Sequence, residues 1–252
     1  MGRLFVNKIL TVSILNLVLL ISPAFGDEIK VAVGLALPPY VLSGTNSGME
    51  MDIVKEALAY KGHTLKPIYL PFIRVVKSFE SGAVDAAMTV NESSQMTSVH
   101  YSDSHITYQN VAVGLSENAL AVENITALGN HSVIAFQNAT RFLGDKYKST
   151  FKNSPNYTEI ADQKSQIGLL FSGRVDALVM DISIFKHLLA NKRHEDSSRK
   201  IYDKNFVTHF LFNPKAYTAG FKSKELCQQF DQGINAIMAD GSYQKIIDSY
   251  LE

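Results

Sequence analysis

The sequence has little of several features that would narrow its function at once. Cys227 is its only cysteine, so no internal disulfide can form and packing must hold the fold together. Acidic and basic residues are equal in number, at 24 each, which argues against nucleic acid as a partner because such a partner needs a basic surface. Beyond the start of the chain, no stretch is long and apolar enough to cross a membrane.

Patterns typical of catalysis and metal binding are also scarce. The spacing of serine, histidine, cysteine and aspartate shows no Ser-His-Asp or Cys-His arrangement. The seven histidines lack short metal-ligand spacing, and the pair His100 and His105 is only a weak signal. Cys227 lies in a helical pattern, where a small buried side chain is expected rather than a nucleophile. We therefore predict no catalytic residue, no metal site and no cofactor.

Residues 1–26 have the composition of a secretory signal peptide. A basic start is followed by an almost wholly apolar run over 9–21 and then by the small residues Ala24 and Gly26. A signal peptidase reads small residues at these two positions, so cleavage is expected before Asp27. The alternative is an uncleaved membrane anchor, but the apolar run is short for a span of about 20 residues.

The expected mature chain is nearly neutral. It keeps 22 basic and 24 acidic residues, and no cysteine near the cleavage point could carry a lipid anchor. We therefore expect a periplasmic protein that is free of the membrane and does not bind nucleic acid.

One six-residue phrase occurs twice. Ser81–Ala86 reads S-G-A-V-D-A, and Ser172–Ala177 reads S-G-R-V-D-A. An apolar helical pattern precedes each copy and a short apolar run follows it, which is typical of a helix, a glycine stop and a buried strand. Two such units predict two similar α/β lobes with a ligand-binding cleft between them. The alternative is that the phrase is only a common way to leave a helix and enter a strand.

Strand and helix patterns alternate along both halves of the mature chain. The first half has strands at 29–33, 65–70 and 87–90, and helices at 48–61 and 71–80. The second half has strands at 132–136, 157–160 and 178–181, a helix from 141 and a helix at 163–171. Two further helices are expected at 223–239 and 243–251, whereas the polar run 191–200 is expected to be a solvated loop.

A set of short motifs adds to this order of elements. They are Pro38-Pro39-Tyr40, the segment 48–54, both S-G-x-V-D-A phrases, the segment 99–103, Asp181 and the segment 239–247. In order and spacing over 29–251, the chain resembles the family 3 extracellular solute-binding proteins, the periplasmic binders of amino-acid-type ABC importers.

The resemblance implies a two-lobed, type II-like periplasmic binding protein fold. Each lobe would be an open α/β sheet, and two hinge crossings would join them. The first lobe would hold residues 27–110 and 209–252, and the second would hold 111–208. The implied function is to capture a small polar solute, amino-acid-like or an amine, and to deliver it to an ABC permease in the inner membrane. We expect the receptor to be a monomer.

Ligands of open α/β sheets bind beyond the carboxyl ends of the strands. In the first lobe, Tyr40 and Phe72 follow strands and would stack on a ligand, or else cover the core. The third strand ends at Thr89, Val90 and Asn91.

The second lobe offers a different set of strand ends. Gln137, Asn138 and Thr140 lie where a strand becomes a helix, and backbone N–H groups there favour an anionic or carbonyl group. The alternative is that Asn138 or Thr140 only caps the helix. Asp181 follows the last strand, and its alternative is a solvated turn carboxylate.

One position departs from the family pattern. The family's amino-acid binders clamp the ligand carboxylate with an arginine, and its place is taken here by Gln95, which cannot form a charged fork. Asp181 matches the family acid that pairs with a ligand amine. Either the ligand lacks an α-carboxylate, or Arg74 or Arg141 supplies the missing charge. A surface ion pair is the plain alternative for each arginine.

Two other functions compete with transport. The same fold senses ligands for signalling partners such as receptor kinases. A few relatives are periplasmic dehydratases, which need a positioned acid or base. Glu92, His100 and His105 are the proton carriers to consider, but each is expected in a solvated loop.

Overall fold

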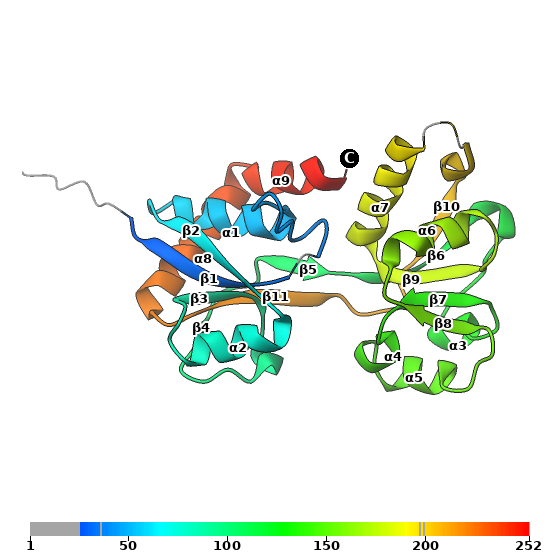
Figure 1. Ribbon diagram of the computed structural model, residues 1–252, viewed down its shortest axis with the longest axis horizontal. Coiled ribbons are helices and arrows are strands. Elements are labelled where there is room, and N and C mark those ends of the chain that lie inside the picture. Colours follow the sequence, from blue (N-terminus) through cyan, green and yellow to red (C-terminus); the bar gives the residue numbers. More distant parts are fainter. Residues whose placement is uncertain (1–25, 36, 197, 199, 252) are drawn as a thin grey trace, which may run out of the picture.

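The computed structural model describes residues 26–35, 37–196, 198 and 200–251 and shows two lobes, each built on one β-sheet (Figure 1). Of the predicted signal peptide, all but Gly26 lies outside the described residues. None of the helices in the described part of the chain is long and apolar enough to span a bilayer.

Lobe 1 is built on the sheet β2-β1-β3-β11-β4, with β5 also paired to β11. Its strands are β1 (Glu28–Gly34), β2 (Thr64–Leu70), β3 (Ala86–Val90), β4 (His100–Tyr101), β5 (Ile106–Tyr108) and β11 (Lys215–Phe221). Its helices are α1 (Met49–Ala59), α2 (Phe72–Glu80), α8 (Lys224–Ala239) and α9 (Ser242–Leu251). Helices α1, α8 and α9 pack together on one face of the sheet, and α2 covers the other (Figure 1).

Lobe 2 is built on the sheet β10-β6-β9-β7-β8. Its strands are β6 (Asn110–Leu115), β7 (Val133–Phe136), β8 (Tyr157–Ile160), β9 (Ala177–Asp181) and β10 (Phe206–His209). Its α-helices are α3 (Ile125–Leu128), α4 (Ala139–Phe142), α5 (Asp145–Phe151), α6 (Gln163–Phe171) and α7 (Ile182–Glu195). Helices α6 and α7 lie on one face and α3, α4 and α5 on the other (Figure 1).

The chain passes between the two sheets twice. The first passage is at Gln109, between β5 and β6, and the second joins β10 to β11. In each lobe the strands that flank a helix are parallel, whereas the strands next to the passages are antiparallel to their neighbours. The predicted α/β architecture of two lobes is therefore confirmed.

Both copies of S-G-x-V-D-A form the predicted helix stop. Gly82 and Gly173 adopt φ angles of 75° and 71°, a left-handed conformation that glycine enters without a side-chain clash. Each helix ends just before its copy, and a buried strand follows.

The aspartate of each copy binds the start of the neighbouring parallel strand. Asp85 Oδ2 accepts a hydrogen bond from Lys30 N at 2.9 Å, and the Asp85 N–H donates to Lys30 O. Asp176 Oδ2 likewise accepts from Ser132 N at 2.9 Å and from Ser132 Oγ at 2.8 Å. The repeated aspartate therefore belongs to the frame of each lobe, at the amino ends of its strands.

Two local predictions were wrong. The polar run 191–200 is helical as far as Glu195, because α7 continues through it. Basic side chains in the last turn of a helix are stabilised by its free carbonyl groups, so a charged run there need not be a loop. The helix expected from Arg141 is interrupted at Gly144, which has a φ angle of 88° and separates α4 from α5.

The core follows the apolar patterns of the sequence. In α8, the predicted face of Leu226, Phe230, Ile234 and Ile237 is buried. Cys227 is buried beside it, as predicted. Burial, with the Asp231 and Asp103 carboxylates nearby, raises the pKa of the Cys227 thiol to about 11, so the thiol stays protonated at neutral pH.

Candidate functional site: a pocket between the lobes

A pocket of about 260 Å³ lies where the two lobes meet. This volume is slightly below the ~300 Å³ at which pockets for drug-sized ligands begin, so it suits a small solute. Its wall is mainly apolar and aromatic, with one carboxylate and one ammonium group. The lining residues are Leu37 from lobe 1; Tyr108, Asn110, Lys215 and Tyr217 near the passages; and Phe136, Phe142, Gln163, Asp181 and Ile184 from lobe 2.

Asp181 ends β9 and caps α7 in the wall of this pocket. Its Oδ1 accepts hydrogen bonds from Ser183 N at 2.9 Å, Ile184 N at 3.1 Å and Tyr40 Oη at 2.8 Å. Its Oδ2 accepts one, from Gln109 N at 2.8 Å. A carboxylate oxygen has two lone pairs, so Oδ2 retains acceptor capacity.

The environment of Asp181 is nearly dry. Its side chain is not the solvated turn carboxylate of the alternative interpretation, because the residue is only 5% exposed. Burial raises the pKa of Asp181, while the hydrogen bonds from Tyr40 and from backbone N–H groups work against this rise. The result is a fixed carboxylate with an open acceptor position in a residue that lines the pocket.

Tyr40 links the two lobes at this point. Its ring is fully buried and stacks on Tyr108, with 3.8 Å between the ring centroids, and its hydroxyl donates to Asp181. Burial first, and the Asp181 charge second, raise the pKa of Tyr40, so the hydroxyl is a neutral donor. The ring that was expected to stack on a ligand or to cover the core thus stacks on another tyrosine.

A buried polar cluster lies next to the tyrosines. The Glu50 side chain is fully buried in the first turn of α1. It accepts hydrogen bonds from Thr89 Oγ1 at 2.8 Å and Tyr108 Oη at 2.8 Å, and its Oε1 lies 3.0 Å from His105 Nε2. We call these four side chains the Glu50 cluster.

The sequence did not reveal the Glu50 cluster. His105 was expected in a solvated loop, which is wrong, because its side chain is fully buried. Glu92 and His100, considered with it, are exposed as expected, although His100 lies in β4 and not in a loop. An acid in the first turn of a helix normally faces water and the helix N-terminus. Only the meeting of α1, β3 and β5 in space brings Glu50, Thr89 and His105 together.

The other predicted residues of lobe 1 lie outside this pocket. Thr89 has a left-handed φ of 59° and turns its hydroxyl to Glu50, and Val90 is fully buried. Asn91 caps the short 3₁₀ helix Glu92–Ser94, and Gln95, which ends it, is exposed.

The beginning of α2 is likewise separate from the pocket. Phe72 is 55% exposed, and Arg74 lines a different hollow together with Lys77, Ser78 and Ser81.

The start of α4 is occupied by a carboxylate of the protein itself. Glu159 accepts hydrogen bonds from Asn138 N at 2.7 Å and from Thr140 N at 2.8 Å. Partial burial opposes the shift, but hydrogen bonds from Thr140 and Tyr157 lower the pKa of Glu159. The backbone groups expected to face a ligand therefore face Glu159.

The side chains beside α4 contribute little to the pocket. The Asn138 side chain makes no capping hydrogen bond. Gln137 and Arg141 are exposed, and the Arg141 guanidinium lies 5.9 Å from the centroid of the Phe142 ring. Twelve residues were predicted for the site. In the described part of the chain, Asp181 is the one of these that lines the pocket, and the Tyr40 hydroxyl donates a hydrogen bond to Asp181.

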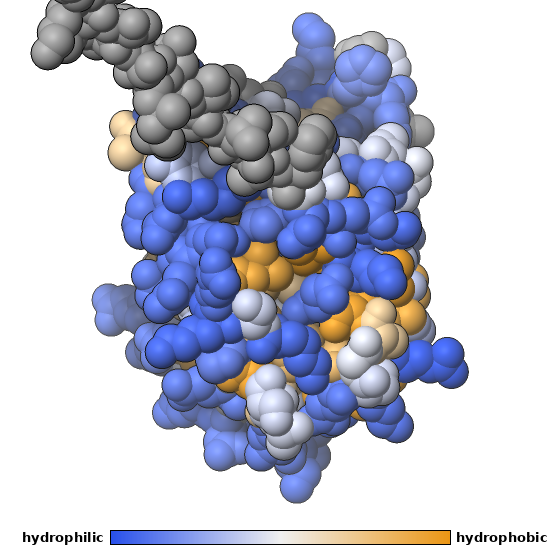
Figure 2. All heavy atoms as spheres, turned by 90° about the vertical axis from the view of Figure 1, so that its left-hand side faces the viewer, coloured by the Kyte–Doolittle hydropathy of each residue, from blue (hydrophilic) through white to orange (hydrophobic). Residues whose placement is uncertain are grey.

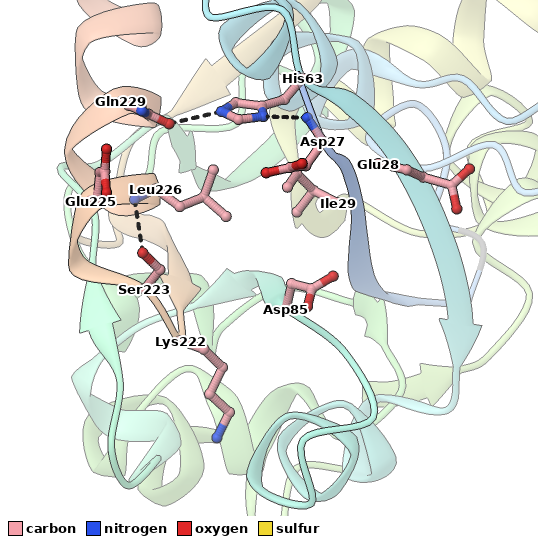
Figure 3. Close-up of a pocket in the computed structure, with 10 residues that line it drawn as sticks. All are labelled: Asp27, Glu28, Ile29, His63, Asp85, Lys222, Ser223, Glu225, Leu226 and Gln229. Atoms are coloured by element: carbon pink, nitrogen blue, oxygen red, sulfur yellow. Dashed lines mark hydrogen bonds between the residues drawn. The ribbon is translucent and has the colours of Figure 1, made fainter. Parts of the chain in front are cut away.

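A second pocket, of about 410 Å³, lies at the far end of lobe 1, at the start of β1 (Figure 3). Both ring nitrogens of His63 are engaged there, with Asp27 N at 3.0 Å and Gln229 Oε1 at 2.7 Å. Figure 2 shows this end as a mostly hydrophilic face with hydrophobic residues near its centre. It is remote from the carboxyl ends of the strands, where open α/β sheets bind ligands.

Across the described residues, no group of three or more His, Cys, Asp or Glu side chains is arranged to hold a metal ion. The Glu50 cluster holds one carboxylate and one imidazole, which bind each other through Oε1 and Nε2, while His105 Nδ1 is buried without a hydrogen-bond partner among the described residues.

Several solved structures share the fold. An ancestral cationic amino acid solute binding protein is 16% identical, with a TM-score of 0.68, over 90% of this chain and 96% of that one. A substrate-binding protein of an amino acid ABC transporter from Streptococcus pneumoniae, bound to L-arginine, is 20% identical, with a TM-score of 0.59, over 90% and 94%. A histidine kinase sensor domain with similarity to periplasmic binding proteins is 14% identical, with a TM-score of 0.61, over 90% and 97%.

No curated protein matches the chain. Residues 29–252, which include nearly all of the described fold, match the family model of the bacterial extracellular solute-binding proteins, family 3. With two α/β lobes, a pocket between them and this match, the chain belongs to the family 3 solute-binding proteins.

Proposed function

We propose that this protein captures a small amine-bearing solute between its lobes and delivers it to an ABC permease in the inner membrane. The observation that carries the proposal is Asp181, a buried carboxylate that lines the pocket at the junction of the lobes and whose Oδ2 accepts a single hydrogen bond, from Gln109 N. A protonated amine is the group that such a carboxylate binds best, because a charge-assisted hydrogen bond is strong in a dry site.

The fixed geometry of Asp181 favours tight binding. Three backbone N–H groups and the Tyr40 hydroxyl hold its carboxylate in one orientation, so little side-chain freedom is lost when a ligand arrives. Tyr108 and Tyr217 line the same pocket. Aromatic rings attract a cation and pack against the apolar part of a solute.

The position of the pocket supports binding coupled to closure. It is lined from both lobes and from the segments that join them, so a ligand inside it contacts parts that move relative to one another in a hinge closure. A ligand shifts such an equilibrium only by the difference in its affinity for the two states. Contacts with both lobes supply this difference, and a permease that recognises the closed form would then collect loaded receptors.

The proposed location is the periplasm. The membership of an extracellular solute-binding family and the signal-peptide composition of residues 1–26 support it.

Sensing for a signalling partner is the second candidate. The likeness of this fold to a histidine kinase sensor domain favours it, although at 14% identity this likeness concerns the fold alone. The two functions share ligand capture and differ in the partner that reads the closed form. Deleting the gene in its source bacterium separates them, because only the transport role predicts lost uptake of the solute.

Catalysis is not proposed for this pocket. Asp181 is already held by four donors, which suits a binding group better than a proton carrier. His105 and Glu50 are buried and bound to each other, and neither lines the pocket.

Calorimetric titration of the purified protein tests the proposal. The panel contains amino acids, biogenic amines, and carboxylates and sugars without an amine. We expect binding to be confined to solutes with a protonated amine and to be accompanied by a smaller radius of gyration in X-ray scattering. Binding of amine-free solutes alone, or of none of the panel, would contradict the proposal.

A further inference from the structure

We propose that Lys215 binds an anionic group of the ligand, in the place of the arginine that the family pattern expects at Gln95. This inference rests on the proposed function, since it concerns the same pocket. It makes the ligand a molecule with both an amine, for Asp181, and an acidic group such as a carboxylate, for Lys215.

The strand register places Lys215 on the face of the pocket. Lys215 begins β11 and is the Cα partner of Tyr108 in the antiparallel pairing of β11 with β5. Residues that are directly opposite in an antiparallel pair project from the same face, as do residues two apart along one strand. Lys215, Tyr108 and Tyr217 therefore share a face, and all three line the pocket that contains Asp181.

The charge of Lys215 is available to a ligand. Its Nζ lies 5.3 Å from the centroid of the Tyr217 ring. The ion pairs among the described residues involve other lysines and histidine, and no described carboxylate lies within 4.0 Å of Lys215 Nζ. A lysine ammonium has three donors, and a ring face satisfies none of them as an anion would.

The two arginines considered from the sequence are less well placed. Arg74 lines the hollow at α2, and Arg141 lies against Phe142 without lining the pocket. Lys215 is the basic residue that the described part of the chain contributes to the same wall as Asp181.

A neighbouring hollow adjoins the pocket at Lys215. This hollow, of about 360 Å³, shares Asn110, Phe142 and Lys215 with the pocket. Lys215 thus stands at the boundary of the two spaces. The amine end of the ligand would lie near Asp181, its acidic group at Lys215, and any further substituent would extend toward Leu211 and Phe212.

The test compares ligands that differ only in the carboxylate. The probes are the pairs L-phenylalanine with phenethylamine and L-arginine with agmatine, titrated calorimetrically into wild type, Lys215→Met and Lys215→Arg. The matched control is Lys61→Met, because the Lys61 ammonium also lies over a tyrosine ring, 5.0 Å from the Tyr60 centroid, but lines neither hollow. Thermal unfolding checks that each variant folds.

We expect Lys215→Met to weaken binding of the carboxylate-bearing member about 10- to 100-fold and to change that of its amine partner less than threefold, since a hydrogen bond to a charged group contributes about 1.5–3 kcal/mol. Lys215→Arg should retain most of the affinity, and Lys61→Met should retain all of it.

Three results would overturn the inference. If the carboxylate-bearing probes bind Lys215→Met as tightly as wild type, the role of Lys215 is wrong while the proposed function stands. If both members of a pair lose affinity equally, Lys215 shapes the pocket and does not bind an anion. If none of the four probes binds wild type, the inference fails together with the proposed function for these solutes.

Discussion

Asp85 in lobe 1 and Asp176 in lobe 2 make equivalent hydrogen bonds at the amino ends of the strands, whereas the carboxylates at the carboxyl ends of the two sheets have different surroundings. At the amino ends, each aspartate binds the backbone of the neighbouring strand. At the carboxyl ends, lobe 1 encloses its acid in the Glu50 cluster. Lobe 2 instead places Asp181 in the wall of the pocket. The repeated phrase therefore joins neighbouring strands in each lobe. The residues after the strands decide whether a carboxylate is enclosed, as in lobe 1, or lines the pocket, as in lobe 2.

The two carboxylates, Glu50 in lobe 1 and Asp181 in lobe 2, therefore have different roles. The carboxylate of lobe 1 binds Thr89, Tyr108 and His105, which are side chains of its own lobe. The carboxylate of lobe 2 has an acceptor position to spare. Tyr40 and Tyr108 connect the two through one hydrogen bond each and through their stacked rings. We therefore expect substitutions at Glu50 to act mainly on stability and substitutions at Asp181 mainly on affinity.

The largest loss of stability is expected for Glu50→Ala. It leaves the buried hydroxyls of Thr89 and Tyr108 and the ring nitrogen of His105 without their partner, and each buried polar group left unsatisfied costs about 1–3 kcal/mol. Urea unfolding measures this cost. Glu28→Ala is the control, because Glu28 forms an exposed ion pair with Lys66 that contributes less than about 1 kcal/mol. A cost for Glu50→Ala no larger than that of the control would disprove the structural role of the cluster.

The two repeated aspartates should respond alike. Asp85→Ala and Asp176→Ala each leave a backbone N–H without its acceptor, so each should lower the free energy of unfolding by about 1–3 kcal/mol. Neither should change ligand affinity, because both lie at the amino ends of the strands. Urea unfolding and calorimetry measure the two effects. A selective loss of affinity in one variant would break the equivalence of the lobes.

The pH dependence of the free energy of unfolding at acidic pH should differ in sign between the contributions of Asp176 and Asp181. Hydrogen bonds from the Ser132 backbone and side chain lower the pKa of Asp176, so its contribution to stability is present above the unfolded pKa of about 3.9 and is lost as the pH falls through the folded value. Burial raises the pKa of Asp181, so its contribution has the opposite sign: it is present below about pH 3.9 and is lost as the pH rises through the folded value.

Unfolding measured from pH 7 to pH 3 checks both signs. As the pH falls, wild type should lose stability relative to Asp176→Asn and gain stability relative to Asp181→Asn. Changes of the same sign against both variants would show that the two carboxyl groups do not differ in this way.

The smallest effect is expected at the two glycine stops. A Cβ at Gly82 or Gly173 would meet no heavy atom within 4 Å, so alanine there costs only the strain of a left-handed backbone, about 1–2 kcal/mol. Thermal unfolding of Gly82→Ala and Gly173→Ala should show nearly equal losses. Clearly unequal losses would mean that the helix stops of the two lobes are not equivalent.

Much of the frame could be predicted from the sequence, because local signals determine it. The 163–171 helix was predicted with its observed bounds, and alternation and glycine stops located β1, β2 and β3 of one sheet and β7, β8 and β9 of the other, whereas β11, inside the first sheet, was not predicted. The position of Asp181 after a strand of lobe 2 followed from the same reasoning.

The contacts of the site could not be predicted, because they join residues far apart in the sequence. Glu50 meets His105 only when α1 packs near β5, and Lys215 reaches the pocket only through its register with Tyr108. Glu159 meets the start of α4 because β8 lies beside β7. None of these contacts produces a recognisable pattern in the nearby amino-acid sequence.

Asp181 is the central residue of the proposed site, and the effect of its substitution on ligand affinity is the most direct measurement. Calorimetry should compare wild type, Asp181→Asn and Asp176→Asn with the amine-bearing solute that binds wild type most tightly. Because truncating one partner of a buried charge pair costs about 2–5 kcal/mol, Asp181→Asn should weaken binding at least 30-fold, while Asp176→Asn changes it less than threefold. Wild-type affinity in Asp181→Asn, or an equal loss in Asp176→Asn, would contradict the proposed site.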